Sequence, residues 1–432
     1  MDSAGNIYRH KVDFTALALQ DPAFKETLSA KGRLDFSNPD AVRQLTVSLL
    51  RRDFGLEVEL PDDRLCPPVP NRLNYILWLQ DLIDCTGDDY HEGFNADRDV
   101  VGLDIGTGSS CIYPLLGAVH RKRWTFVATD IDKKNLQYAR QNVQRNNLQS
   151  RIQVVDSVPD GPLIPLDRIQ LKMLDFTMCN PPFYESHEEM KQLAEEKQNE
   201  PLSVCTGAET EMITPGGEVA FVKKMIQESL HLREAVRWYT SMLGKRSSLL
   251  SLIDELQSLD NKNWAVTEFI QGDKTKRWAI AWSWKDIRPT MGVSRSVSNI
   301  PKKYLPFPSE FHFRLPCKSV DSLIEVIDTE INSFRIPWKW DNQRSSGLGF
   351  TMENAWSRQA RRKRQQQQEA AQDGSDQADI PFDTENALFG FIIQVRRPGL
   401  ENADVTVRWI KGVDSVIFES FCGMLKRKVE GR

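Results

Sequence analysis

The sequence predicts an α/β protein with a Rossmann-like parallel sheet, preceded by a helical arm and followed by a smaller α+β domain. Three observations support this fold class. From Val100 onward, short apolar runs alternate with helical stretches, as in a parallel sheet whose strands are joined by helices. The first of these runs leads into a turn that contains Gly106 and Gly108. Beyond about residue 288 the alternation stops and a second pattern of strands and helices begins.

The N-terminal arm, residues 14 to 60, is predicted to be helical. The stretch from Ala41 to Phe54 repeats apolar residues at helical spacing on one face and ends with two arginines, which favour the last turn of a helix. A second helix is predicted from Leu73 to Ile83.

The central sheet follows from a series of apolar runs. The predicted strands are Val100–Asp104, Phe126–Thr129, Ile152–Val155, Phe176–Cys179 and Arg237–Met242, with helices at Lys133–Asn146 and Gly217–Ser229. Two further β-rich runs, Trp264–Phe269 and Arg277–Trp284, are joined by a short turn and predict an antiparallel hairpin at the end of the sheet.

The region after the hairpin predicts a separate domain, so we divide the chain into residues 1–287 and 288–432. Its predicted elements are a strand at Phe311–Leu315, a helix at Val320–Ser333, strands at Leu388–Val395 and Val405–Ile410, and a helix at Val416–Lys426. Residues 343–382 contain few apolar residues and four consecutive glutamines, which predicts a disordered insertion.

Composition excludes several classes of protein. The seven cysteines are scattered and lack metal-ligand spacing, which argues against a structural metal and for a reducing compartment. The longest apolar runs are too short for a membrane helix and the N-terminus is too polar for a secretion signal, so we expect a soluble intracellular protein. A net charge of −4 means that an anionic partner would need local basic patches.

The glycine turn predicts a cofactor site. Asp104 precedes it, and Asp130 ends the next strand, where an acid can accept hydrogen bonds from ribose hydroxyls. The turn lacks the third glycine of a dinucleotide motif, so S-adenosylmethionine fits better than NAD. A plain structural turn is the alternative interpretation.

The segment Asn180-Pro181-Pro182-Phe183 follows the fourth predicted strand and predicts methylation of a planar nitrogen. The amine of a purine is a poor nucleophile, so its N–H bonds need acceptors as charge develops, and the Asn180 side chain and the Pro181 carbonyl can supply them. The prolines restrict the backbone, and Phe183 offers a face for base stacking. The alternative is a simple turn, because Asn-Pro commonly begins one.

Basic and aromatic residues late in the sheet are candidates for RNA binding. They are Lys245, Lys274, Arg277 and Trp278, which could neutralise phosphates or, for the tryptophan, stack on a base. A solvated surface explains them equally well. The run Arg361–Arg364 is a candidate nuclear-localisation signal or a solubilising stretch, so we expect the nucleus, the cytoplasm or both.

Several longer stretches carry a family resemblance. They are Pro39–Thr46, Asp53–Leu56, Arg72–Ile76, Leu103–Gly117, Asn180–Phe183, Gly216-Gly217 and Gln271-Gly272. In these the chain resembles the methyltransferase-like protein 16 family of U6 small nuclear RNA adenine-N6 methyltransferases and, more distantly, bacterial ribosomal RNA adenine-N6 methyltransferases. The resemblance covers roughly residues 30 to 285.

This resemblance implies roles for individual residues. Arg72 would hold the methionine carboxylate, Gly106 and Ser110 would contact the cofactor at the glycine turn, and Asp130 would replace a glutamate that binds ribose. The Asn180–Phe183 segment would be catalytic and the region after residue 288 would bind RNA. The threonine that contacts adenine in the family has no clear counterpart, and the loop after Phe183 is acidic where vertebrate members carry arginines.

Three alternatives to methylation of U6 RNA stay open. Ribosomal RNA could be the substrate. Protein glutamine could be the acceptor, because such enzymes share an Asn-Pro-Pro-aromatic motif, although their fourth residue is usually tyrosine and here it is Phe183. The protein could also bind RNA without turnover, which the presence of Arg72, Asp104, Asp130 and Asn180 disfavours.

Overall fold

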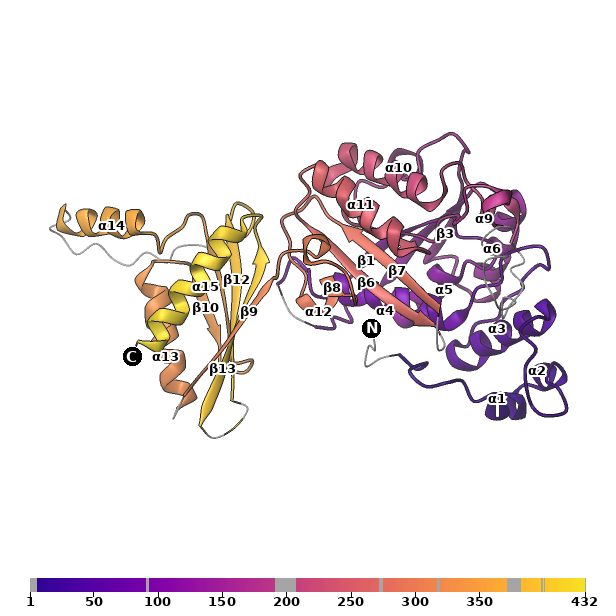
Figure 1. The fold of residues 1–432 in the computed structure, drawn as a ribbon, viewed down its shortest axis with the longest axis horizontal. Helices are drawn as coiled ribbons and strands as arrows, with labels where there is room; N and C mark the ends of the chain where they lie inside the picture. Colours follow the sequence, from indigo (N-terminus) through magenta and orange to yellow (C-terminus); the bar gives the residue numbers. More distant parts are fainter. Residues whose placement is uncertain are drawn as a thin grey trace. The chain divides into compact units, whose positions relative to one another are not determined.

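The computed structural model describes residues 6–90, 93–190, 207–271, 275–316, 319–370, 382–397, 399 and 401–431. Contacts divide the chain into two compact units. The first comprises residues 1–84, 92–285 and 293–305, and the second comprises residues 85–91, 286–292 and 306–432. Figure 1 labels the helices and strands of each unit.

The first unit begins with a helical arm and continues into a sheet. The arm and the helix after it are α1 (Phe14–Gln20), α2 (Pro22–Glu26), α3 (Pro39–Phe54) and α4 (Val69–Asp84). The sheet strands are β1 (Val100–Ile105), β2 (Trp124–Asp130), β3 (Ile152–Asp156), β4 (Leu174–Cys179), β5 (Val236–Leu243), β6 (Trp264–Gln271), β7 (Thr275–Trp282) and β8 (Arg295–Ser296). The other helices are α5 (Ile112–His120), α6 (Lys133–Arg145), α7 (Leu166–Ile169), α9 (Glu209–Met212), α10 (Gly217–Leu232), α11 (Arg246–Ser258) and α12 (Met291–Ser294), with short 3-10 turns η1 (Arg233–Ala235) and η2 (Lys302–Tyr304).

The residues at the two ends of helix α3 explain where the helix begins and ends. The Asn38 side chain caps its first turn by accepting hydrogen bonds from two backbone amides, and Pro39 occupies the first helical position, where an N–H would be unsatisfied. Gly55 ends the helix in the left-handed region, with φ of 64°. The start and end of the predicted helix are confirmed within two residues.

The sheet of the first unit has the strand order β3-β2-β1-β4-β5-β7-β6-β8. The strands from β3 to β5 are parallel, whereas β7 is antiparallel to both β5 and β6. The predicted hairpin and the Rossmann-like fold class are therefore confirmed, with β8 added beside β6. The strand order reverses between β1 and β4, and ligands of open α/β sheets bind at such a switch point, beyond the carboxyl ends of the strands.

The core of the first unit packs helices against both the parallel strands and the hairpin. Met225 and Ile226 of α10, Leu252 of α11, and Trp282 of β7 are all fully buried in one apolar cluster. The Tyr239 and Trp282 rings stack with 5.6 Å between their centroids. This packing supports β4 and β5, the strands on one side of the switch point between β1 and β4.

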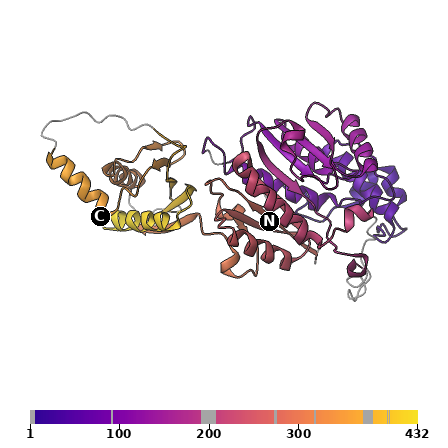
Figure 2. The same ribbon diagram turned by 90° about the horizontal axis from the view of Figure 1, so that it is seen from above.

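The second unit is a five-stranded antiparallel sheet with two long helices. Its elements are β9 (Glu310–Pro316), α13 (Val320–Ser333), β10 (Trp338–Asp341), β11 (Ser346–Thr351), α14 (Arg358–Ala370), β12 (Phe389–Arg396), β13 (Asn402–Lys411) and α15 (Ser415–Glu430), and the sheet order is β10-β11-β12-β13-β9. Helices α13 and α15 lie side by side over the sheet (Figures 1 and 2) and share its apolar core.

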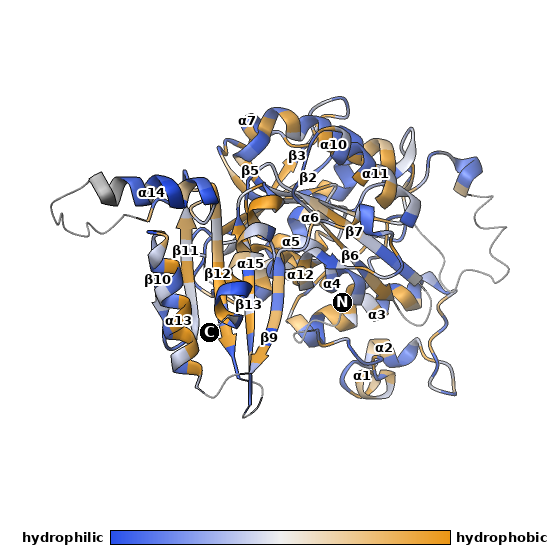
Figure 3. Cartoon of the chain, turned by 60° about the vertical axis from the view of Figure 1, so that its left-hand side comes forward, coloured by the Kyte–Doolittle hydropathy of each residue, from blue (hydrophilic) through white to orange (hydrophobic). Residues whose placement is uncertain are grey.

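Residues 343–370 differ from the disordered insertion that the sequence predicts, and residues 371–381 of that insertion lie outside the described residues. Strand β11 lies inside this range and pairs with β10 and β12, and α14 follows it. The strand was missed because Gly347 and Gly349 break its apolar pattern. A side chain at either position would collide with the rings of Trp338 or Phe391, which explains the glycines. Helix α14 is hydrophilic along its described length (Figure 3).

Within the described part of the chain, no helix is both long enough and apolar enough to cross a membrane.

Candidate active site

The turn after β1 leaves free space beside its backbone at Gly106. Gly106 and Gly108 have φ of 73° and 66°, values that favour glycine, and a β-carbon at Gly106 would meet no atom within 4 Å. The amides of Gly106 and Thr107 both donate to the Thr129 carbonyl, at 2.9 and 2.8 Å. The turn is thereby held against the end of β2. Ser110, also predicted as a cofactor contact, is buried where the turn leads into α5.

Asp104 is a fully buried acid at the end of β1. Burial is the main cause that raises its pKa to about 7, and the negative charge of Asp130 acts in the same direction. The Thr107 hydroxyl and the Arg72 guanidinium lower this pKa. Among the described residues, no group donates a well-aligned hydrogen bond to either carboxylate oxygen. The carboxylate is therefore able to accept hydrogen bonds from a ligand.

Asp130 stands at the end of the neighbouring strand β2. One of its oxygens accepts a hydrogen bond from the Gly108 amide at 2.8 Å and a weaker one from the Asn135 side chain at 3.4 Å. The other accepts from the Asp132 amide at 2.9 Å. Burial raises the pKa of Asp130, and these hydrogen bonds oppose the rise. The contact with Gly108 fixes the acid beside the glycine turn.

Arg72 enters the same region from α4. Its Nη1 donates to the Tyr113 hydroxyl at 2.7 Å, and its guanidinium carbon lies 5.3 Å from the centroid of the Tyr113 ring. The side chain is 6% exposed, yet its Nε has no hydrogen-bond partner within the described residues. A buried guanidinium with a spare donor suits a carboxylate ligand.

The Asn180–Phe183 segment follows β4 directly. Residues Asp104 and Ile105 pair with Met178 and Cys179, so Asn180 leaves the sheet beside the start of the glycine turn. The Asn180 Oδ1 atom is buried and accepts no hydrogen bond from the described residues. The site therefore contains an uncommitted acceptor next to the candidate cofactor pocket.

Phe183 is held from two sides. Gly244 lies against its ring, and the guanidinium carbon of Arg277 lies 5.5 Å from the ring centroid. Glu218, which is 2% exposed, accepts hydrogen bonds from the amides of Gly244 and Lys245 at 2.6 and 3.0 Å. This buried carboxylate fixes the turn that supports Phe183.

The residues predicted to bind RNA are not all equivalent. Lys245 forms an ion pair with Glu189 of the acidic segment, and both side chains are partly exposed. Arg277 faces Phe183, as described above. Trp278 is half-buried against the core of the first unit, so its ring is engaged in packing and is not an exposed stacking surface. Lys274 lies outside the described residues.

The sequence model of a family described as RNA methyltransferase matches residues 3–286. The chain belongs to this RNA methyltransferase family. The predicted family membership and enzyme class are thereby confirmed.

Curated relatives extend the match over nearly the whole chain. The U6 small nuclear RNA (adenine-(43)-N(6))-methyltransferase of Schizosaccharomyces pombe is 36% identical over 398 residues, covering 92% of this chain and 95% of that protein. The RNA N(6)-adenosine-methyltransferase METTL16 of Homo sapiens is 44% identical over 293 residues, which cover 66% of this chain and 50% of that protein.

Solved structures resemble about two thirds of this methyltransferase. The human METTL16 catalytic domain in complex with MAT2A 3'UTR hairpin 1 has a TM-score of 0.58 and 44% identity, covering 66% of this chain and 95% of that chain. The N-terminal domain of human METTL16 in complex with SAH has a TM-score of 0.54 and 41% identity, with coverages of 66% and 98%.

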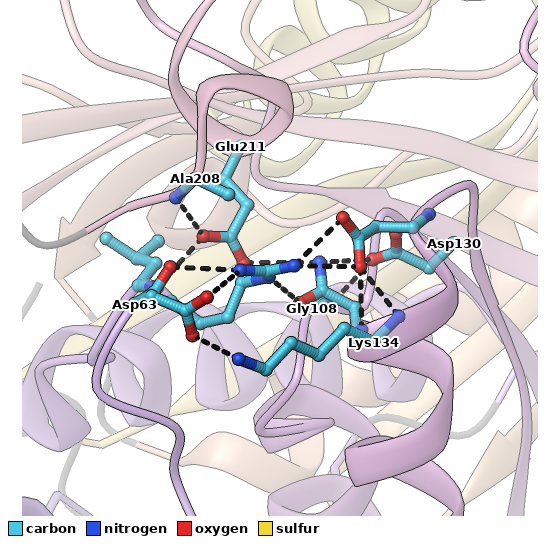
Figure 4. Close-up of polar contacts among 10 residues, drawn as sticks. Asp63, Gly108, Asp130, Lys134, Ala208 and Glu211 are labelled. Atoms are coloured by element: carbon cyan, nitrogen blue, oxygen red, sulfur yellow. Dashed lines mark hydrogen bonds and ion pairs between the residues drawn. The ribbon is translucent and has the colours of Figure 1, made fainter.

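Several residues near the site of this methyltransferase are not predicted from the sequence. Arg64, Asn135, Glu211 and Glu218 come from segments far apart in the chain, and the first three meet in a polar network around Gly108 and Asp130 (Figure 4). Only three-dimensional proximity connects them. The sequence shows acids at residues 209 and 211, but it does not show that Glu211 belongs to the site while Glu209 is exposed.

Proposed function

We propose that this methyltransferase transfers a methyl group from S-adenosylmethionine to N6 of an adenine in U6 small nuclear RNA. The observation that carries this proposal is the buried, unpaired Asn180 Oδ1 at the end of β4. The similarity to the S. pombe U6 enzyme, over 95% of that protein, favours U6 as the RNA. The human relatives in complex with an RNA hairpin and with SAH favour a structured RNA and this methyl donor.

The polar groups around the glycine turn fit the cofactor. Arg72 Nε is buried without a hydrogen-bond partner among the described residues, and the buried Asp104 carboxylate receives no well-aligned hydrogen bond from them. These donors and acceptors match a zwitterionic amino acid, whose carboxylate would bind Arg72 and whose ammonium would face Asp104. Asp130 would accept from ribose, and the open space at Gly106, with Gly108 and Ser110, would admit the ligand close to the backbone. The cofactor supplies an electrophilic methyl group on a sulfonium.

The catalytic work of the chain is to bind and orient the amine. The Asn180 Oδ1 and the Pro181 carbonyl would accept hydrogen bonds from the two N–H bonds of the exocyclic amine, which turns the nitrogen lone pair toward the methyl group. Such acceptors stabilise the positive charge that develops on the nitrogen. Phe183, held by Gly244 and Arg277, would support the base by stacking.

The RNA would extend beyond the active site. We propose residues 1–287 as the methyltransferase domain and residues 288–432 as an RNA-binding extension, with Lys245, Lys274 and Arg277 as phosphate contacts on the first of these. The proposed substrate is a nuclear RNA, so we propose that the enzyme acts in the nucleus, with the cytoplasm as the alternative location.

The proposal is tested by incubating the purified chain with labelled S-adenosylmethionine and U6 RNA. We expect N6-methyladenosine in U6 RNA and none in U6 RNA whose adenine 43, the position named for the S. pombe enzyme, is replaced by guanine. Asn180→Ala should abolish labelling, whereas Gln149→Ala, at an exposed site of the first unit, should not. Labelling of ribosomal RNA or of protein glutamine in place of U6 RNA would contradict the proposal.

A further inference from the structure

Glu211 of α9 brings a carboxyl group close to Asp130, at the nucleoside end of the candidate cofactor site. It comes from the chain segment that follows the catalytic residues, yet its side chain reaches the group formed by Gly108 and Asp130 (Figure 4). The Glu211 Oε1 atom lies 3.7 Å from the position that a β-carbon of Gly108 would occupy. The Glu211 carboxylate therefore lies next to the backbone of the glycine turn at Gly108.

The Glu211 carboxylate is tied to two other parts of the chain. Its Oε2 accepts hydrogen bonds from the amides of Leu65 and Ala208, both at 2.9 Å, and its Oε1 accepts one from the Asn135 side chain at 3.2 Å. Burial raises the pKa of Glu211, and the hydrogen bonds from the two backbone amides oppose the rise. A carboxylate that is partly removed from water needs such donors, so the position of Glu211 is well specified.

Asn135 connects Glu211 to Asp130. Its Nδ2 donates to Oδ2 of Asp130 at 3.4 Å and to Oε1 of Glu211 at 3.2 Å, so one amide bridges the two acids. Its Oδ1 accepts from Nε of Arg64 at 3.0 Å. Because a guanidinium can only donate, Arg64 fixes which end of the amide faces the two carboxylates.

The backbone next to Glu211 is hydrogen-bonded to the residue that follows the proposed catalytic segment, Asn180–Phe183. The residue after Glu211, Met212, accepts a hydrogen bond through its carbonyl from the Tyr184 amide at 3.0 Å, and the Tyr184 carbonyl accepts from the Thr214 amide at 3.0 Å. Tyr184 immediately follows Phe183. A short run of hydrogen bonds thus connects Asp130, through Asn135 and Glu211, to the backbone that carries the catalytic residues.

We propose that Glu211 is a positioning residue that couples binding at the nucleoside end of the cofactor pocket to the placement of Asn180–Phe183. The inference rests on the proposed function, in which Asp130 binds the ribose. A ligand that orders Asp130 and Asn135 would order Glu211 and, through Met212 and Tyr184, the acceptors for the target amine. The coupling explains why a partly buried acid contributed by α9 lies beside Asp130.

The test compares Glu211→Gln with Glu209→Gln, a matched loss of charge on the same helix at an exposed position. In Glu211→Gln the amide nitrogen must face either the two backbone amides or the Asn135 amide, so at least one hydrogen bond is lost. We expect the affinity for SAH, measured by calorimetry without RNA, to fall about tenfold. We also expect kcat at saturating S-adenosylmethionine to fall about tenfold, with the Glu209→Gln control unchanged.

The combined change separates a positioning role from simpler ones. If Glu211 only contacted the cofactor, its substitution would raise the KM for S-adenosylmethionine and leave kcat unchanged. If it only stabilised the fold, its substitution would change neither the SAH affinity nor the kcat of the folded protein. If Glu211→Gln does not fold, Asn135→Ala breaks the same connection and should change both constants. A folded variant of either residue with wild-type SAH affinity and kcat would overturn the inference. If the wild-type chain itself neither binds SAH nor methylates RNA, the proposed function fails instead.

Discussion

Gly244 lies in direct contact with the ring of Phe183. A β-carbon at residue 244 would come 2.9 Å from Cδ1 and 3.4 Å from Cε1 of that ring. The φ of Gly244 lies outside the positive region, so the reason for glycine is space and not backbone conformation. With Arg277 on another side, the ring of the catalytic segment has little freedom to move.

Substitution Gly244→Ala is therefore expected to displace Phe183 and reduce catalysis. Real β-carbon contacts of 2.9 Å are not tolerated, and a shift of the ring would misplace the stacked base by a fraction of an ångström or more. We predict that kcat falls about tenfold while SAH affinity changes less than about twofold. Gly292→Ala is the control, because a β-carbon there meets no atom within 4 Å. Equal kcat for the two variants would contradict the role of Gly244.

Much of this architecture was predictable, because buried parallel strands leave a strong local signal. The β1 to β4 strands are continuous apolar runs, and Asp104, Asp130 and Asn180 end three of them, so topology alone brings these residues to one edge of the sheet. Strand β11 was not predictable, because its glycines are required by rings of neighbouring strands that are distant in sequence.

The supporting residues of the site were harder to predict for the same physical reason. Glu218 is buried and Glu211 partly buried, but the sequence around an acid does not show whether its carboxylate is buried or exposed, as Glu211 and the exposed Glu209 illustrate. For Trp278 the sequence offers stacking on RNA as one interpretation, and the structure shows its ring partly buried against the core of the first unit.

The buried Asp104 predicts a pH-dependent stability in the cofactor-free protein. Its pKa in the folded state is about 7, above the ordinary value of 3.8, so the folded state binds the proton more tightly between these two pH values. The unfolding free energy should therefore fall as pH rises from about 4 to about 7 and level off above that range.

Asp104→Asn removes this titration. We predict that, in urea denaturation without cofactor, the variant is more stable than the wild type at pH 8, by up to about 4 kcal/mol, with a smaller difference at pH 5. Part of the slope should persist, because Asp130 and Glu211 also have raised pKa values. Asp160→Asn, at an exposed position, should retain the wild-type profile. Parallel profiles for wild type and Asp104→Asn would show that Asp104 does not titrate in this range.

A substitution at Gly102 tests how tightly strands β1 and β4 pack next to the candidate active site. Gly102 lies in β1, and a β-carbon there would overlap Cζ of the Phe176 ring and lie 2.6 Å from its Cε2. Because Phe176 is fully buried between Trp124 and Phe126, its ring cannot move aside easily. We predict that Gly102→Ala lowers the unfolding free energy by about 1–3 kcal/mol in urea denaturation. Gly399→Ala, where a β-carbon meets nothing, should be close to wild type.

The ion pair between Lys245 and Glu189 predicts that RNA affinity depends on the acidic loop after Phe183. If Lys245 contacts an RNA phosphate, Glu189 competes with that phosphate for the same ammonium group. Removing the competitor should strengthen RNA binding, so we predict that Glu189→Gln raises the affinity for U6 RNA about threefold in low salt. Glu188→Gln removes the same charge from the neighbouring residue and should have a smaller effect.

Lys245 must account for this gain if the competition is direct. Lys245→Gln should weaken RNA binding and reduce the slope of log affinity against log salt concentration by about 1. In the double variant with Glu189→Gln, the gain from the glutamate substitution should disappear, because the ammonium group for which Glu189 competes is gone. Affinities measured by fluorescence anisotropy at several salt concentrations give all of these values. A gain from Glu189→Gln that persists without Lys245 would mean that the acidic segment repels RNA through its overall charge, and Lys245 would then not be a phosphate contact.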